Sequence, residues 1–248
     1  MENSIYIALS SQMVLRRQLS MVANNLANVN TPSFKGEQML FSEYLTDAKN
    51  TKLGSNDSKY HFVRAIGNMR DLAEGPMNRT GNELDVAIDG EGYFVVNTEE
   101  GKRYTRHGRF QLNQNNELIT AAGHVVQSEN GGPITIPVEA VNISISTDGT
   151  VANGDQNIGK IALVTFEDEQ KLERGQNNLY KTDQIEKPPE RTNIVQGMLE
   201  QSNVNSIIEL TQMIAIHRKH DSVKRVIDDE HRRIERMINR LGQSSGQS

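Results

Sequence analysis

IYIALSSQMVLRRQLSMVANNLANV, residues 5–29, repeats its apolar side chains every three or four positions. Positions with this spacing share one face of a helix, so the pattern predicts a helix that packs along another helix. The helix must end near residues 28–30, because Pro32 disfavours the helical conformation of Thr31. Apart from an interruption at Gln12, the predicted seam consists of Ile5, Ala8, Leu15, Leu19, Val22, Leu26 and Val29.

A second helical pattern covers residues 203–241. Asn205 is one candidate N-cap, and Ser206 is another because Ser206 and Glu209 have the spacing of a capping box. Gly242 is a natural helix stop, and the small polar residues 242–248 predict a disordered tail. The apolar stripe of this helix consists of Val204, Ile207, Leu210, Ile214, Val223, Ile227, Ile234, Met237 and Leu241.

Between the two ends the apolar period becomes two, which indicates β-strands. The clearest runs are residues 84–88, 93–96, 110–112, 141–145 and 161–166, and turn pairs such as Asp89-Gly90 and Asp148-Gly149 separate them. No helical pattern of 10–15 residues lies between the runs, which argues against a parallel α/β sheet. We therefore expect a central all-β domain over residues 60–190.

The predicted fold class is α+β, with terminal helices that pair as a coiled-coil-like inner layer and a central all-β domain. Residues 36–59 lack a sustained period and residues 187–190 read KPPE, so we expect linkers over residues 36–59 and 191–202. Residues 1–35 and 203–241 then form one discontinuous helical domain. Its narrow apolar stripes must be buried against each other and against other copies, which is typical of an assembling protein.

Composition limits the possible functions. The 248 residues carry 27 Lys and Arg against 32 Asp and Glu, a net charge of −5 that argues against a nucleic-acid partner. The chain has no cysteine, which excludes disulfides, thiolate metal sites and cysteine nucleophiles. No apolar stretch approaches the roughly 20 residues of a membrane-spanning helix. The first residues contain Glu2 and no basic region, so we expect no cleaved signal peptide.

Motifs with a chemical role are weak. His217, His220 and Asp221 have a spacing that suits zinc, but the adjacent Arg218 and Lys219 disfavour a cation and a polar helix face explains all of them. We therefore expect no catalytic residue, no cofactor and no metal. A different class of function, a β-domain hydrolase or glycan-binding module with helical extensions, would need a convergent polar pocket in the middle of the chain.

Four blocks of sequence carry a resemblance to a known family. NNLANVNTPSFK, residues 24–35, resembles the N-terminal signature of flagellar rod, hook and hook-associated axial proteins. TGNELDVAIDGEGYF, residues 80–94, and YTRHGRF, residues 104–110, are similar to consecutive blocks of the rod and hook proteins, and SNVN, residues 202–205, is similar to their C-terminal region. The matching positions include Asn25, Leu26, Ala27, Asn28, Thr31, Phe34, Thr80, Gly81, Asn82, Leu84, Asp85, Gly90, Gly92 and Phe94.

Within this family the chain resembles the proximal rod branch most, with the distal rod branch as the near alternative. The stretch between Phe110 and Pro188 has no large insertion, which argues against a full-size hook protein, and the opening residues 4–10 resemble the proximal rod branch. The chain departs from the family pattern at Pro32-Ser33, where Thr-Gly or Pro-Gly is usual, and at Ser206, where Pro is usual.

The resemblance implies a structural subunit of the bacterial flagellar basal-body rod. Such a subunit stacks helically with itself and other rod subunits, with the distal rod protein as a neighbour, into a periplasmic drive shaft that transmits torque and encloses the export channel. The resemblance also implies passage through the flagellar type III export apparatus without a cleaved signal peptide. It places the terminal helices in the inner layer of the tube and the β domain in the outer layer.

Overall fold

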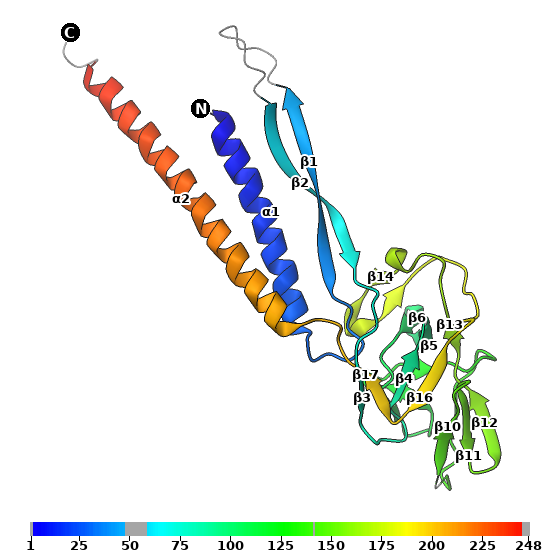
Figure 1. Ribbon diagram of the computed structural model, residues 1–248. Coiled ribbons are helices and arrows are strands. Elements are labelled where there is room, and N and C mark those ends of the chain that lie inside the picture. The colour runs from blue at the N-terminus through cyan, green and yellow to red at the C-terminus, as the bar shows by residue number, and fades with distance from the viewer. Residues whose placement is uncertain (1, 48–58, 141, 245–248) are drawn as a thin grey trace. The chain divides into compact units, whose positions relative to one another are not determined.

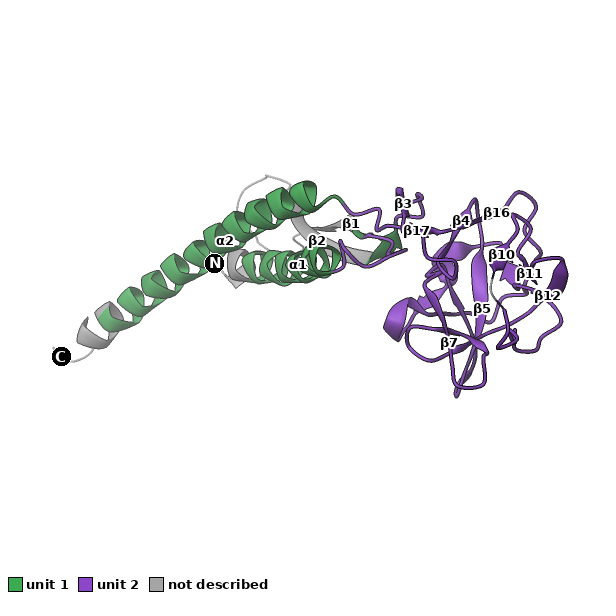
Figure 2. Cartoon of the chain, turned by 90° about the horizontal axis from the view of Figure 1, so that it is seen from below, with its two compact units in different colours: residues 1–27, 37–70, 205–248 green, residues 28–36, 71–204 purple. Residues whose placement is uncertain are grey.

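The computed structural model describes residues 2–47, 59–140 and 142–244, and the chain divides into two compact units (Figure 2). Unit 1 comprises residues 1–27, 37–70 and 205–248, and unit 2 comprises residues 28–36 and 71–204. The chain therefore passes between the units after Ala27, Gly36, Arg70 and Val204.

Unit 1 combines two helices with a β-hairpin (Figure 1). Helix α1 (Glu2–Ala27) packs against helix α2 (Ser206–Ser244), and the two run in opposite directions. Strand β1 (Glu37–Asp47) pairs antiparallel with β2 (Lys59–Arg70), and both strands contact α1. The two predicted helices are confirmed, whereas a coiled-coil geometry of their pairing stays a prediction. Neither helix, over its described residues, is long and apolar enough to cross a membrane.

The start of α2 agrees with one of the two predicted N-caps, whereas its end lies beyond the predicted stop. Asn205 is the N-cap, because its Oδ1 accepts hydrogen bonds from the backbone N–H groups of Ile207 at 3.0 Å and Ile208 at 3.3 Å. The capping box on Ser206 is therefore wrong, since Ser206 is already the first helical residue. The helix also continues past Gly242 to Ser244, so the disordered tail is wrong for residues 242–244, and residues 245–248 lie outside the described part.

The linker predicted over residues 36–59 is wrong for residues 37–47, which form β1. This segment lacks strict alternation, and its strand depends on pairing with β2 and on contact with α1, which a single-sequence pattern does not contain. Strand β2 belongs to unit 1, so the predicted start of the central β domain at residue 60 is also wrong. The β-rich segment of unit 2 begins at Asp71. Residues 48–58 of the predicted linker lie outside the described residues.

Unit 2 contains the remaining described strands, and their pairings are antiparallel. The largest sheet has the order β14-β15-β6-β5-β9-β8-β7 with β13 also paired to β5; β10-β11-β12 form a second sheet, and β16 pairs with β4 and β17 with β3. The bounds are β3 (Met77–Arg79), β4 (Val86–Asp89), β5 (Tyr93–Thr98), β6 (Gly101–Thr105), β7 (Phe110–Leu112), β8 (Leu118–Thr120), β9 (Val125–Val126), β10 (Ile143–Ile145), β11 (Thr150–Asn153), β12 (Gln156–Lys160), β13 (Leu163–Val164), β14 (Glu173–Arg174), β15 (Tyr180–Lys181), β16 (Asn193–Gln196) and β17 (Met198–Glu200).

The predicted all-β nature of the central region is confirmed, but the linker predicted over residues 191–202 is wrong. That segment contains β16 and β17, in which Ile194 and Leu199 are buried. Its few apolar residues gave too short a pattern to indicate a strand, and the strands form because the chain returns to pair with β4 and β3.

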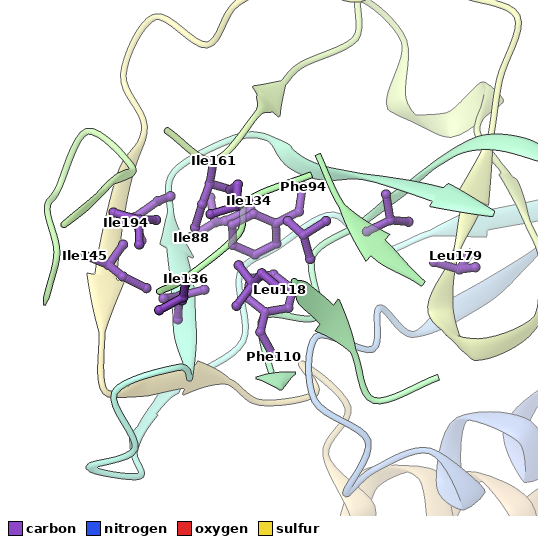
Figure 3. Packing of buried hydrophobic residues seen from close by; sticks show 14 residues of the cluster. Ile88, Phe94, Phe110, Leu118, Ile134, Ile136, Ile145, Ile161, Leu179 and Ile194 are labelled. Atoms are coloured by element: carbon purple, nitrogen blue, oxygen red, sulfur yellow. The ribbon is translucent and has the colours of Figure 1, made fainter. Parts of the chain in front are cut away.

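Strand β5 is buried on both faces, which explains its continuous apolar run. Phe94 and Val96 join the main core, where the Phe94 and Phe110 rings meet edge-on with centroids 5.2 Å apart (Figure 3). Tyr93 and Val95 point to the other face and join a second cluster. Alternate side chains point to opposite faces of a strand, so β5 holds two cores together in unit 2.

Candidate assembly interface and its anchoring contacts

Glu200, the last residue of β17, lies buried between two cations in unit 2. Its Oε1 accepts hydrogen bonds from Lys35 Nζ at 2.6 Å and from the backbone N–H of Gly75 at 3.1 Å, and its Oε2 accepts one from Arg106 Nε at 2.9 Å. The side chains of Lys35, Arg106 and Glu200 are only 4%, 5% and 1% exposed. A buried charge requires such partners, so these three side chains, the Glu200 cluster, constrain three distant parts of the chain at once.

The electrostatics of the Glu200 cluster favour the ionised carboxylate. Burial by itself raises the pKa of Glu200, but Arg106 and Lys35 together outweigh burial and hold this pKa below its ordinary value. The stabilisation that follows is complete above the pKa of a glutamate in the unfolded chain. It is lost as the pH falls through the lower pKa of the folded state.

Arg106 also explains the Gly90-x-Gly92 motif. Its Nη1 donates hydrogen bonds to the carbonyl oxygens of Gly90 and Gly92, each at 3.0 Å. The two glycines have φ angles of +107° and +144°, which residues with a Cβ rarely adopt. The motif is therefore the turn between β4 and β5, and it presents carbonyl groups to a buried guanidinium.

Ser33 accounts for the departure at Pro32-Ser33. It adopts the left-handed conformation with φ +57°, where glycine is usually favoured. Its buried hydroxyl donates a hydrogen bond to the Arg106 carbonyl at 2.9 Å, and its backbone N–H donates to the Glu200 carbonyl at 2.9 Å. The unfavourable backbone conformation of Ser33 is therefore accompanied by two hydrogen bonds, to the backbone carbonyls of Arg106 and Glu200.

Asn203 joins the remaining segments that lead into and out of unit 2. Its Oδ1 accepts a hydrogen bond from the backbone N–H of Gly36 at 2.8 Å, and its Nδ2 donates to the carbonyls of Asp71 at 3.0 Å and Ala73 at 2.9 Å. The backbone N–H of Asp71 in turn donates to the Gly36 carbonyl at 2.7 Å. Three segments of unit 2 are therefore held together: the one between α1 and β1, the one that follows β2 and the one that precedes α2.

The other family-like positions in unit 2 shape turns and core. Phe34 is fully buried, and the Arg174 guanidinium lies 4.0 Å from the centre of its ring. Thr31 Oγ1 donates to Asn28 Oδ1 at 3.2 Å. The backbone N–H groups of Thr80 and Gly81 donate to the Gly197 carbonyl, Asn82 Nδ2 donates to Asp85 Oδ1 at 3.3 Å, and Leu84 and Phe94 pack in the main core.

In unit 1, Asn25 joins separate segments by hydrogen bonds, as Asn203 does in unit 2. Its Oδ1 accepts a hydrogen bond from the backbone N–H of Glu37 at 3.0 Å, and its Nδ2 donates to the Glu37 carbonyl at 2.9 Å and to Glu209 Oε1 at 3.1 Å. One buried amide therefore ties α1 to β1 and α2. Glu209 Oε2 is buried without a hydrogen-bond partner among the described residues, and burial raises the pKa of Glu209 although Asn25 opposes this.

Within one chain, the predicted apolar stripes are covered on α1 and on the distal half of α2. Val22 is fully buried, Leu15, Leu19 and Leu26 are half-buried, and Val29 is half-buried in unit 2. On α2 the covered face contains buried Ile216 and half-buried Val223, Ile227 and Ile234. Val223 lines a groove together with Val14 and Leu15 of α1, so this face meets α1. The side chains of Ile5 and Leu241 lie outside the described part.

The first part of the predicted α2 stripe lies on a different face. Ile207, Leu210 and Ile214 are 75%, 50% and 48% exposed, so α1 of the same chain does not cover them. The buried apolar residue in this part of α2 is Ile216, which the sequence analysis does not name. Met237 is also exposed, and Val204 is half-buried in unit 2. As contacts with other copies these residues stay a prediction.

A matching exposed stripe on α1 was not recognised from the sequence. Tyr6, Leu9 and Met13 are 61%, 47% and 65% exposed. Met13 is nine residues from buried Val22, and Ile207 is nine residues from buried Ile216. At about 100° per residue each separation is roughly half a turn, so both exposed stripes lie opposite the covered faces of their helices. We call Tyr6, Leu9 and Met13 the outer stripe of α1, and Ile207, Leu210 and Ile214 the outer stripe of α2.

Among the described residues, the side chains considered for metal binding or catalysis do not come together in one site. His217 Nδ1 lies 3.2 Å from Asp221 Oδ2, and the described residues contain no group of three or more side chains placed to hold a metal. A cleft of about 350 Å³ in unit 2 has charged side chains along its lining, but these form pairs, Lys102 with Glu186 and Lys160 with Glu129, each at 3.2 Å.

Comparison with known families agrees with the motifs. Residues 5–35 match the family described as flagella basal body rod protein, residues 87–153 match the flagellar hook protein FlgE/F/G D1 domain, and residues 195–240 match the flagellar basal body rod FlgEFG protein C-terminal region. These ranges contain Lys35, Arg106 and Glu200, so the Glu200 cluster links the three matched regions.

Full-length relatives support the same assignment. The chain is 39% identical to the flagellar basal-body rod protein FlgF of Caulobacter vibrioides over 98% of this chain and 99% of the relative. It is 33% identical to FlgF of Rhizobium meliloti, covering 98% and 100%, and 31% identical to the rod protein FlgG of Bacillus subtilis, covering 96% and 99%. The chain therefore belongs to the family of flagellar basal-body rod proteins, the structural subunits of the rod. Within this class it is most like the proteins named FlgF.

Replacing Glu200 tests the Glu200 cluster. Glu200→Gln removes the buried carboxylate that contacts both cations and leaves only the half-exposed Glu74, whose Oε1 lies 3.9 Å from Arg106 Nη2, so we expect the free energy of unfolding of unit 2 to fall by about 3–5 kcal/mol at pH 7. Urea unfolding followed by circular dichroism measures the loss. The matched control is Glu129→Gln, because Glu129 is exposed and its ion pair with Lys160 contributes about 0–1 kcal/mol. Equal losses in both variants would contradict the role of the cluster.

Glu209 predicts a pH dependence of opposite sign for unit 1. Because its pKa is raised in the folded state, the folded chain binds the proton more tightly, and the packing of α1 on α2 becomes more stable as the pH falls from 7 toward 5. Glu209→Gln removes this gain. Hydrogen exchange of the helix amides, corrected for intrinsic rates, measures it, with exposed Asp229→Asn as the control that keeps the response. A parent protein with no gain in protection at pH 5 would refute this prediction.

Proposed function

We propose that the chain is a proximal rod subunit that assembles helically with itself and with other axial proteins into the periplasmic drive shaft, which transmits torque and encloses the export channel. In this proposal the distal rod protein is a neighbour, and the flagellar type III export apparatus delivers the chain. The role is structural rather than enzymatic. Full-length similarity to relatives named FlgF supports the proximal assignment.

The outer stripes of α1 and α2 are the observation that carries this proposal. A helix needs one apolar face to pack on its partner, and in unit 1 that face is already covered. Exposed apolar side chains that repeat along a second face mark a surface that another protein covers. Both helices of unit 1 carry such a surface, so a subunit has two places at which neighbours can attach.

The Glu200 cluster suits a part under mechanical load. Force that enters through α1 or α2 reaches the chain segments next to Ala27 and Asn205, and these segments lead directly into residues held by Glu200 and Asn203. Paired buried charges and hydrogen bonds resist separation because breaking one pair strands a charge away from water. The Glu200 cluster therefore holds together the segments of unit 2 that lie next to the points where the chain passes between the two units.

The β-domain hydrolase or glycan-binding module remains without a supporting site. Such a function needs a nucleophile and base in contact, or unpaired polar groups directed into a pocket. The charged side chains of the unit 2 cleft pair with each other instead, and Asp148 at its rim accepts hydrogen bonds from Thr150. Nothing in the cleft favours this function over rod assembly.

Changing one outer-stripe residue tests the proposed function. Ile214→Glu places a charge on a surface that assembly must desolvate, so a strain whose own rod gene is replaced by this variant should lose swimming and contain no variant in its basal bodies. Unfolding of the purified variant should match the parent, because Ile214 is already half exposed. Ile185→Glu is the matched control, since Ile185 is 84% exposed in unit 2 and should tolerate the charge. Normal swimming with Ile214→Glu would contradict the proposal.

A further inference from the structure

We propose that the groove between α1 and α2 in unit 1 binds an acidic amphipathic helix of another protein. The groove has a volume of about 550 Å³, and the residues that line it lie within residues 11–18 of α1 and 218–223 of α2. None of the six outer-stripe residues lines it. The inference goes beyond the proposed function, because it concerns a binding surface of the single chain.

The shape and the apolar lining of the groove suit a helix. Val14, Leu15 and Val223 are half-buried, and most of the exposed lining of the groove is apolar. Residues 11–18 make two turns of α1, roughly 11 Å at 1.5 Å per residue. A helix that lies in such a groove presents apolar side chains at positions i, i+3 or i+4 and i+7, which cover the same length. The groove can therefore hold two turns of an amphipathic helix.

The charge of the groove selects an acidic partner. Arg218 and Lys219 line it and are exposed, and neither forms an ion pair with another described residue. Among the described residues that line the groove none is acidic. Two cations beside an apolar surface attract carboxylates that flank the apolar face of a partner and repel a basic partner.

The helices of a second copy do not supply such a face. Among the described residues the α-helices of this chain are α1 and α2. Beyond Glu2 the charged residues of α1 are Arg16 and Arg17, so α1 is basic. Most acidic residues of α2 already lie beside a basic side chain of the same helix, in the pairs His217–Asp221, Arg232–Asp229, Arg233–Glu230 and His231–Glu235. The occupant that the charges favour is therefore a helix of another protein.

Binding of a synthetic peptide to the purified full-length chain tests the inference. The probe is a helix of about 18 residues, or five turns, with leucines and one tryptophan along one face and glutamates beside that face. The chain contains no tryptophan, so tryptophan fluorescence reports on the probe alone. We expect the emission to move to shorter wavelength as the tryptophan enters the groove, and the binding to weaken as salt is added. A second probe with lysine in place of every glutamate should bind at least about tenfold more weakly.

Charge reversal in the groove locates the binding. Arg218→Glu combined with Lys219→Glu should weaken binding of the glutamate probe by about tenfold or more and strengthen binding of the lysine probe. A gain for the lysine probe also shows that the variant is folded. The matched control is Arg232→Glu combined with Arg236→Glu, which changes the net charge of α2 equally at exposed positions outside the groove. Arg232 lies about 20 Å along α2 from Lys219, beyond the screening length of about 8 Å at physiological salt, so the control should keep the parent affinity.

Several results would overturn the inference. Equal weakening by both double variants would show a response to net charge alone, and equal binding of the two probes would show no selection of acidic side chains. If neither probe binds, but the chain binds phosphatidylglycerol vesicles or associates with itself and Arg218→Glu with Lys219→Glu abolishes this, the groove belongs to a lipid surface or to a second copy. None of these results bears on the proposed function, which the swimming of the Ile214→Glu strain tests separately.

Discussion

The burial of one carboxylate between two cations is the constraint on which the structure of unit 2 depends. Glu200 is surrounded by Lys35, Arg106 and the Gly75 backbone N–H, and removal of the carboxylate would leave the two cations close together in the interior. The three side chains come from positions 35, 106 and 200, so the cluster forms only when the N-terminal, central and C-terminal parts of unit 2 have come together. Closure over such distances carries a large entropic cost, which the neighbouring strand pairs and core must offset.

The helices of unit 1 use two apolar faces for different purposes. The inner face of α2, with Ile216 and Val223, holds α2 against α1, while the outer stripes remain available to other subunits. Asn25 fixes the helix pair at one end by binding both Glu37 and Glu209. In the proposed assembly a subunit is stabilised by one set of side chains and joined to its neighbours by another, so an outer-face change should impair assembly without unfolding the chain.

Periodicity predicted the two helices, the β strands of the central region and the approximate end of α1, because each depends on local side-chain alternation. At the start of α2 it selected Ile207, Leu210 and Ile214, which are exposed in the single chain, and not the buried Ile216. Ile214 and Ile216 both belong to apolar rows there, and spacing alone does not say which row meets α1. Strands β1, β16 and β17 were missed because pairing with distant partners creates them. The Glu200 cluster gave no local signal, since its members are single charged residues far apart in sequence, although Lys35 and Arg106 lie within family-like blocks.

A reconstruction of the intact basal body by electron cryo-microscopy, at a resolution that shows side chains, tests the central claim most directly. The account predicts that Leu9 and Leu210 of this subunit are both covered by neighbouring axial subunits, while Glu200 remains enclosed by Lys35 and Arg106 within each copy. A map in which both outer stripes face solvent, with neighbouring subunits in contact only through unit 2, would contradict the account.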